Sequence, residues 1–134
     1  MPYTVEVIDN GKGIQHVGSG IVSGGDLMTS AATVLKMVHE GLTPEYAVTD
    51  LTHVTDFSVS AEEIARNAAL NNEVARRLPR VKVAIIAPAD NIFGMARMWQ
   101  AHMDGSGWVS KVFRNRADAL TWLKQSAKPG PNGE

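Results

Sequence analysis

Apolar residues from position 81 onward follow a strand, helix, strand, helix pattern. Residues 81–87 are apolar at nearly every position and stop before Pro88, which predicts a strand buried on both faces of a sheet. Apolar residues then recur at helical spacing over 92–103, and a second strand, 108–113, leads into a helix capped by Asn115. This alternation predicts parallel strands joined by helices, with 81–87 at the centre of the sheet.

The first half of the chain opens with a predicted hairpin. Residues 3–8 alternate between apolar and polar side chains, and the Asp-Asn-Gly sequence at 9–11 supplies residues that tolerate positive φ. Residues 14–17 then continue as the second strand. The first two strands are therefore expected to be antiparallel.

Helix and strand boundaries follow in the middle of the chain. Ser23 is a predicted N-cap of a helix that ends at Gly41. A short strand, 46–51, and a loop, 52–59, come next, and Ser60 then begins a second helix with Glu63 as its capping-box partner.

The resulting order is ββαβαβαβα. Right-handed crossovers place the later strands side by side, so the fold class is α/β: a five-stranded mixed sheet with an antiparallel first strand and helices on both faces. We expect one domain over residues 1–127. Residues 128–134 contain Pro, Gly, Asn and charged residues, which predicts a disordered C-terminal tail.

Composition narrows the functional class. The chain has 134 residues, 44% of them apolar, with 13 Lys and Arg against 14 Asp and Glu. This near balance of charge gives no general attraction for nucleic acid. No segment has the roughly 20 apolar residues of a membrane span, and the first residues resemble no signal peptide. The chain has no cysteine, so we expect a cytoplasmic protein without disulfides.

A crevice at the carboxyl ends of the parallel strands is the first candidate site, because ligands favour this edge in open α/β sheets. A small enzyme that uses His53 with Asp56 or Asp50 as acid and base is one interpretation. The favoured interpretation is structural: Ser60 caps the second helix, Asp90 caps the third, and Asp56 and Ser58 bond their own backbone in the loop. The residues that share this crevice are Asp50, His53, Asp56, Ser58, Ser60 and Asp90.

An apolar surface on the third helix is the second candidate. Phe93, Met95 and Met98 lie beyond what the core face of one helix needs, so they are expected to cover a second side. A homodimer with this helix at its interface is predicted, since a two-fold pairing closes such a surface. A protein partner or an apolar small molecule is the alternative occupant. The full candidate surface comprises Phe93, Met95, Met98, Trp99 and Trp108.

Neither a metal nor a cofactor is expected. The four histidines, His16, His39, His53 and His102, fall on four different predicted elements. The glycines between residues 18 and 25 lack the spacing of a dinucleotide loop, so we interpret them as a bulge and the start of a helix.

Several segments together resemble the bacterial SpoIIAA-like proteins, also called STAS-like or STAS/SEC14-domain proteins. These are the segment 20–27 (GIVSGGDL), the strand 81–87, the segment 112–114 (VFR) and the segment 119–123 (ALTWL). The resemblance covers nearly the whole chain before the tail. It implies the fold of anti-sigma factor antagonists and of lipid-carrying CRAL-TRIO domains, without a resident cofactor.

One departure concerns the phosphorylation switch that the resemblance implies. The segment 50–52 (DLT) fits the strand end of the phospho-switch antagonists, but 58–61 (SVSA) replaces their Asp-Ser-Ser-Gly, so Val59 stands at the phosphorylated serine. The leading hypothesis is therefore a non-enzymatic binding or regulatory module of SpoIIAA-like type. A carrier of a lipid or small apolar metabolite, and a small enzyme using His53, are the alternatives.

Overall fold

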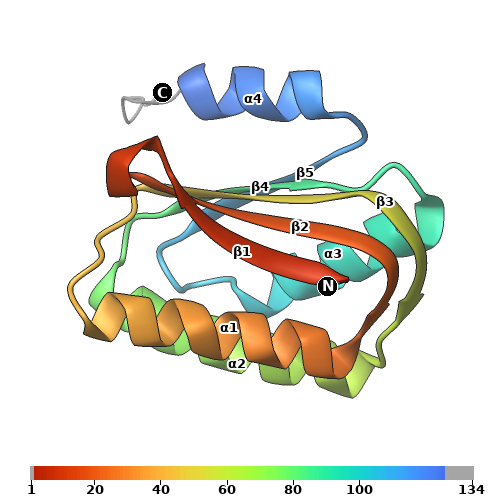
Figure 1. Ribbon diagram of the computed structural model, residues 1–134, viewed down its shortest axis with the longest axis horizontal. Coiled ribbons are helices and arrows are strands. Elements are labelled where there is room, and N and C mark those ends of the chain that lie inside the picture. The colour runs from red at the N-terminus through yellow and green to blue at the C-terminus, as the bar shows by residue number, and fades with distance from the viewer. Residues whose placement is uncertain (1, 126–134) are drawn as a thin grey trace.

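The structure is a computed structural model and describes residues 2–125 (Figure 1). The predicted tail, 128–134, lies outside the described residues. Within them, no helix is both long enough and apolar enough to cross a membrane. In chain order the elements are β1 (Tyr3–Ile8), the 3-10 helix η1 (Asp9–Gly11), β2 (Gly13–Ser23), α1 (Gly24–His39), β3 (Tyr46–Ser58), α2 (Ala61–Arg77), β4 (Lys82–Ile86), α3 (Asp90–His102), β5 (Val109–Phe113) and α4 (Arg116–Gln125).

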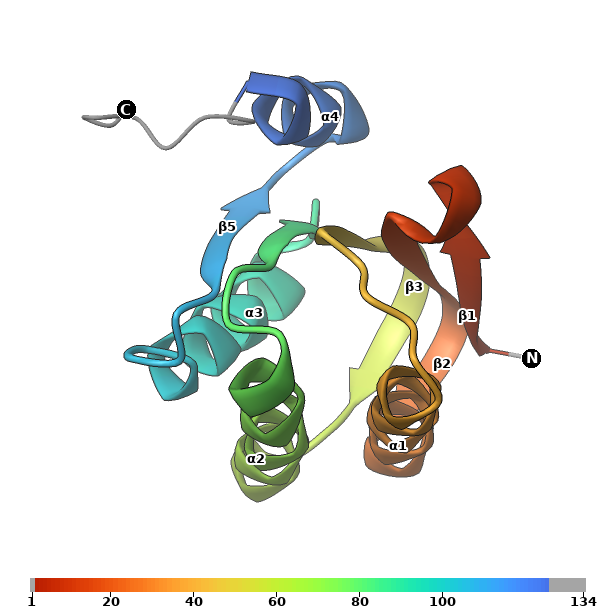
Figure 2. The ribbon, with the colours of Figure 1, turned by 90° about the vertical axis from the view of Figure 1, so that its left-hand side faces the viewer.

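The strands form one five-stranded sheet in the order β1-β2-β3-β4-β5. β1 is antiparallel to β2, and the other neighbouring pairs are parallel. Figures 1 and 2 show α1, α2 and α3 on one face of the sheet and α4 on the other. The predicted fold class and element order are confirmed.

β4 is buried on both faces, as its continuous apolar pattern predicted. Val83 and Ile85 belong to the core under α1, α2 and α3, whereas Ala84 and Ile86 pack with Ala119 of α4. The prediction that this strand forms the centre of the sheet was wrong, because β3 is the central strand and β4 lies between β3 and β5. Helices on both sides bury a strand whether or not it is central.

The β1–β2 hairpin turns through η1. Asp9, Asn10 and Gly11 have positive φ angles of 55°, 53° and 90°, the left-handed region that Asp, Asn and Gly tolerate best. The turn pairs Ile8 with Gly13. The predicted hairpin is confirmed.

β3 is longer than the sequence pattern predicted. Residues 52–58 continue the strand alongside β2 instead of forming a loop. β3 carries one extra residue at each of two bulges. At the first, the three steps from Asp50 to His53 lie opposite the two steps from Val17 to Ser19 of β2. At the second, the two steps from Val54 to Asp56 lie opposite a single step of β2. Each bulge reverses which face of the sheet the following side chains point to. Core residues in this part of β3 therefore recur every third position, at Leu51, Val54 and Phe57, and do not show the alternation typical of a strand.

Both long helices on the α1–α2 side begin with complete capping boxes. Ser23 caps α1 with Asp26 as its partner, and Ser60 caps α2 with Glu63 as its partner. In each box the hydroxyl oxygen accepts from the third helical N–H, and the acidic side chain accepts from the backbone N–H of the cap. The predicted starts of these helices are confirmed.

Replacing Ser60 by alanine is expected to destabilise the fold by about 1 kcal/mol, because the N–H of Glu63 loses its acceptor at the start of α2. Denaturant melts measure this change. Ser58→Ala is the matched control, since Ser58 is an exposed strand residue outside the box, and it is expected to cost much less. Equal and negligible costs for the two variants would contradict the role of this cap.

Candidate functional site

The predicted crevice residues do not converge on one pocket. Asp50 lies at the last β3 position that pairs with β4, where Arg116 donates to its carboxylate at 2.9 Å. Partial burial raises the pKa of Asp50, but hydrogen bonds from Thr52 and Arg116 outweigh it and hold the pKa below its ordinary value. Asp50 therefore acts as the anchor of an ion pair to the start of α4.

The other polar residues of that set are dispersed. His53 and Asp56 are exposed on the extended part of β3, opposite Ser19 and Ile21 of β2. No hydrogen bond or ion pair in the described part of the chain joins His53 to Asp56. Ser58 is exposed, and Ser60 is occupied as the cap of α2.

Asp90 differs from the prediction that it caps the third helix. α3 has Ala89 at its N-cap position and no side-chain cap there. The Asp90 side chain is 95% exposed and accepts a hydrogen bond from Arg114 at 2.7 Å. Because α3 begins at Asp90 itself, this residue is in the first turn and not at the cap.

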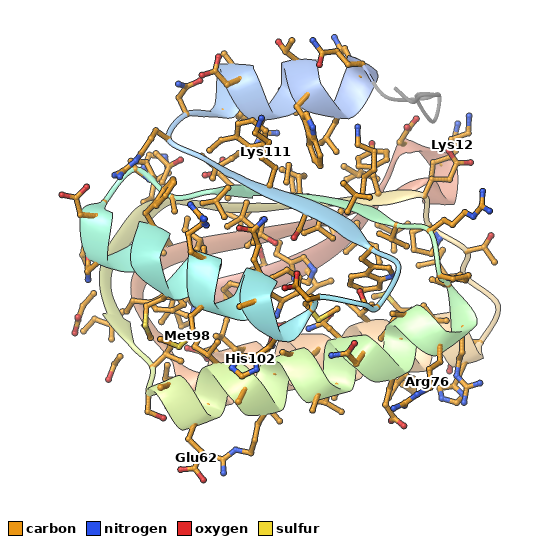
Figure 3. The ribbon with its side chains drawn as sticks, turned by 180° about the vertical axis from the view of Figure 1, so that it is seen from behind. Lys12, Glu62, Arg76, Met98, His102 and Lys111 are labelled. Carbon is orange, nitrogen blue, oxygen red and sulfur yellow. The ribbon has the colours of Figure 1, made fainter. Side chains whose placement is uncertain are left out.

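The apolar residues of α3 also serve different roles. Phe93 lies under the guanidinium of Arg114, 4.0 Å from it, and packs on the core, and Met95 lines an interior cavity. Met98 is 36% exposed, and Figure 3 shows it on α3 near α2. A homodimer through this helix stays a prediction, with Met98 as its most exposed member.

An interior cavity lies between the sheet and helices α1, α2 and α3. Its volume is about 100 Å³. Most of the lining is aliphatic or aromatic, including Ala31 and Val34 of α1, Ala96 and Trp99 of α3, and Trp108. No Asp, Glu, Lys or Arg of the described chain contributes to this lining. The cavity is therefore uncharged and mainly apolar.

Three polar side chains of adjacent strands stand together in the wall formed by the sheet. Tyr3 of β1, His16 of β2 and Thr49 of β3 all line the cavity. His16 and Thr49 are direct register partners, and the rings of Tyr3 and His16 lie 5.8 Å apart. We call these residues the Tyr3–His16–Thr49 cluster.

His16 is the unusual member of this cluster. Its Nδ1 is the sole buried side-chain nitrogen or oxygen without a hydrogen-bond partner among residues 2–125. Burial lowers the pKa of His16 from 6.5 to about 4, so the ring is neutral at pH 7. Burial likewise raises the pKa of Tyr3 far above its ordinary value, and a hydrogen bond with Thr49 opposes the rise. The cluster is thus neutral and polar.

The facing helices are joined by Asn67, which is buried in α2 with 8% exposure. Its Nδ2 donates to the carbonyl of Leu27 in α1, and its Oδ1 accepts from the indole N–H of Trp99 in α3, both at 2.9 Å. Asn71 donates to the same Oδ1 at 3.0 Å. Asn67 therefore holds three helices around the cavity.

No sequence motif marks these interior polar residues. On β2, His16 is two residues after the buried Ile14, so both side chains point to the same face of the strand. Asn67 lies one helical turn after the buried Ile64. In both cases, a polar residue on the apolar face of a strand or helix is the sequence feature that indicates an interior polar site.

Metal binding has no support in this region or elsewhere in residues 2–125, where no group of at least three His, Asp or Glu side chains is placed to hold an ion.

Comparisons with known proteins give structural matches alone. No protein-family model matches the chain, and no curated protein matches it. Among solved structures, an uncharacterised DUF3478-family protein with a SpoIIAA-like fold from Shewanella loihica PV-4 has a TM-score of 0.58 at 21% identity, over 90% of this chain and 91% of that one.

The second match is the phosphorylated form of the Bacillus cell fate determinant SpoIIAA. Its TM-score is 0.53 at 10% identity, over 90% of this chain and 98% of that chain. Both matches cover 90% of this chain, so the likeness concerns the fold and not one motif. The protein therefore has the SpoIIAA-like fold that the resemblance of its sequence implied.

Proposed function

We propose that the protein is a non-enzymatic binding module whose interior cavity holds a small apolar molecule. The observation that carries this proposal is the cavity of about 100 Å³ lined mainly by aliphatic and aromatic side chains. Dry apolar cavities of roughly 150 Å³ accommodate benzene. The cavity in this protein is smaller than that, so the expected occupant is no larger than a single ring or a short hydrocarbon chain.

The cavity is a better candidate than the predicted crevice. The crevice residues are exposed or already bonded to arginines and helix N–H groups, which leaves them no shared space to enclose a ligand. By contrast, side chains from the sheet and three helices converge on the cavity. An apolar space on which side chains of several elements converge is typical of small-molecule sites.

A regulatory role is part of the proposal. A ligand that binds only the folded protein stabilises it by RT ln(1 + [L]/Kd), and the cavity lies among the three helices that Asn67 joins. Occupancy would thus change how firmly α1, α2 and α3 pack on the sheet. SpoIIAA, with the same fold, is a cell fate determinant, and a regulatory module fits that precedent.

Titration of the full-length protein with toluene, followed by ¹H–¹⁵N NMR, tests the proposal. We expect saturable shifts at residues that line the cavity. Ala31→Leu is expected to abolish them, because Ala31 is 2% exposed and its side chain faces the cavity. Ala32→Leu is the matched control, since Ala32 is exposed on the same helix.

Two outcomes would reject the cavity as the binding site. One is the absence of any saturable shift with the wild-type protein. The other is normal toluene binding by a folded Ala31→Leu variant. Ala96→Leu, which changes another buried lining residue on α3, gives the same comparison should the first variant fail to fold.

The non-enzymatic assignment is tested by changing the two exposed residues of β3 that could act as acid and base. Replacing His53 and Asp56 together by alanine is expected to cost under about 1.5 kcal/mol, because both are exposed. An activity screen is expected to show no difference between this variant and the wild type. Turnover of any substrate by the wild type that the folded variant loses would overturn the non-enzymatic assignment.

A further inference from the structure

The polar cluster in the cavity wall has an unfilled hydrogen-bonding capacity. His16 lines the cavity beside Tyr3 and Thr49, and no hydrogen bond reaches either of its ring nitrogens among residues 2–125. The surrounding protein closes off Nδ1, so Nε2 is the ring nitrogen that a ligand can reach. A hydrogen bond to this nitrogen would return free energy that the unpartnered ring lacks.

The chemistry of a neutral imidazole narrows the ligand's polar group. Such a ring offers one N–H donor and one nitrogen lone pair. A hydroxyl group both donates and accepts, so it complements either tautomer of His16. A purely hydrocarbon ligand would offer the ring no hydrogen bond.

The absence of charged side chains from the cavity lining limits the charge that a ligand can carry. Among the described residues no arginine or lysine faces the cavity to pair with a carboxylate or phosphate, and no Asp or Glu faces it to pair with an amine. Burying an unpaired charge there would cost far more than a hydrogen bond to His16 returns. The ligand must be neutral.

We propose that His16, with Tyr3 and Thr49 beside it, is the recognition site for the hydroxyl group of a small, neutral, otherwise apolar ligand, such as a phenol or a short alcohol. This inference rests on the proposed function, since it names the polar group of the molecule that the cavity holds. The apolar lining contacts the ring or chain, and the Tyr3–His16–Thr49 cluster selects the hydroxyl.

Phenol and toluene are the matched probes, because a hydroxyl in one replaces a methyl group in the other at nearly the same shape. Their dissociation constants are measured by NMR titration at pH 7 for the wild type and for His16→Leu. We expect the toluene-to-phenol ratio of dissociation constants to fall at least tenfold in the variant. The ¹⁵N resonances of the His16 ring are expected to move with phenol and not with toluene.

The outcomes separate this inference from the proposed function. If neither probe binds the wild type, the cavity itself is not a ligand site. If both probes bind and the toluene-to-phenol ratio of dissociation constants is the same in the variant, the cavity binds ligands but His16 does not recognise a hydroxyl. A water molecule would then be the hydrogen-bond partner of the His16 ring. Should His16→Leu fail to fold, the wild-type ¹⁵N shifts decide, and equal shifts with both probes would overturn the assignment.

Discussion

Replacing Asn67 by leucine is expected to destabilise the protein by about 2 kcal/mol, because the indole N–H of Trp99 loses its acceptor at roughly 1–3 kcal/mol, whereas the carbonyl of Leu27 keeps the hydroxyl of Ser30 as a donor. The indole N–H of Trp99 and the carbonyl of Leu27 both bond to Asn67 at 2.9 Å. Leucine has nearly the same shape as asparagine, so packing is largely kept. Urea melts of the wild type and the variant measure the loss.

Asn72→Leu is the matched control for this prediction. Asn72 is on the same helix and donates to the carbonyls of Ala68 and His102, but it is half-buried rather than buried. Water replaces those bonds when the amide is removed, so the expected cost is under about 1 kcal/mol. Similar losses for both variants would show that Asn67 contributes no more than a surface asparagine.

Trp99→Phe separates the contribution of the indole hydrogen bond. This change keeps an aromatic ring on α3 while it removes the donor to Asn67. In a double-mutant cycle with Asn67→Leu the two costs are expected to be non-additive, because both variants break the same bond. Additive costs would place the two side chains in independent environments.

Acidification from pH 6.5 to pH 4 is expected to remove roughly 3 kcal/mol of stability through His16 alone. Burial lowers the pKa of His16 from 6.5 to about 4 in the folded protein, so in this range the unfolded chain binds a proton that the folded chain excludes. The contribution is fully present above pH 6.5, falls as the pH drops, and levels off below pH 4.

Denaturant melts at several pH values test this prediction. Tyr3 and Tyr46 are the other titratable side chains of the cavity lining, and neither changes charge between pH 4 and 6.5. His16→Phe keeps a ring in the wall and is expected to flatten the pH dependence relative to the wild type. His53→Gln is the control, since His53 is exposed. A wild-type slope that His16→Phe leaves unchanged would contradict the buried, neutral state of the ring.

Local patterns in the sequence were sufficient for the order and type of the elements. The two capping boxes, the Asp-Asn-Gly turn and the apolar strand at 82–86 each depend on residues close together in the chain. Their hydrogen bonds and φ angles form wherever the segment lies in space. For that reason the α/β class and the antiparallel first strand could be predicted correctly.

The length of β3 and the place of β4 depended on tertiary structure. The bulges that keep Leu51, Val54 and Phe57 in the core exist because β3 pairs with β2 over its whole length. No local sequence pattern within 52–58 predicts the pairing of this segment with β2. Likewise, the burial of β4 follows from its two covered faces, which any strand between two helical layers shares.

The candidate site was decided by the tertiary structure alone. A cavity is space that packing leaves between elements distant in sequence, so Ala31, Thr49 and Ala96 acquire a common role only after folding. The sequence by itself determined that His16 points with Ile14 to one face of a strand. That the ring then meets no partner in the described chain, and lies beside Tyr3 and Thr49, is a property of three strands and three helices brought together.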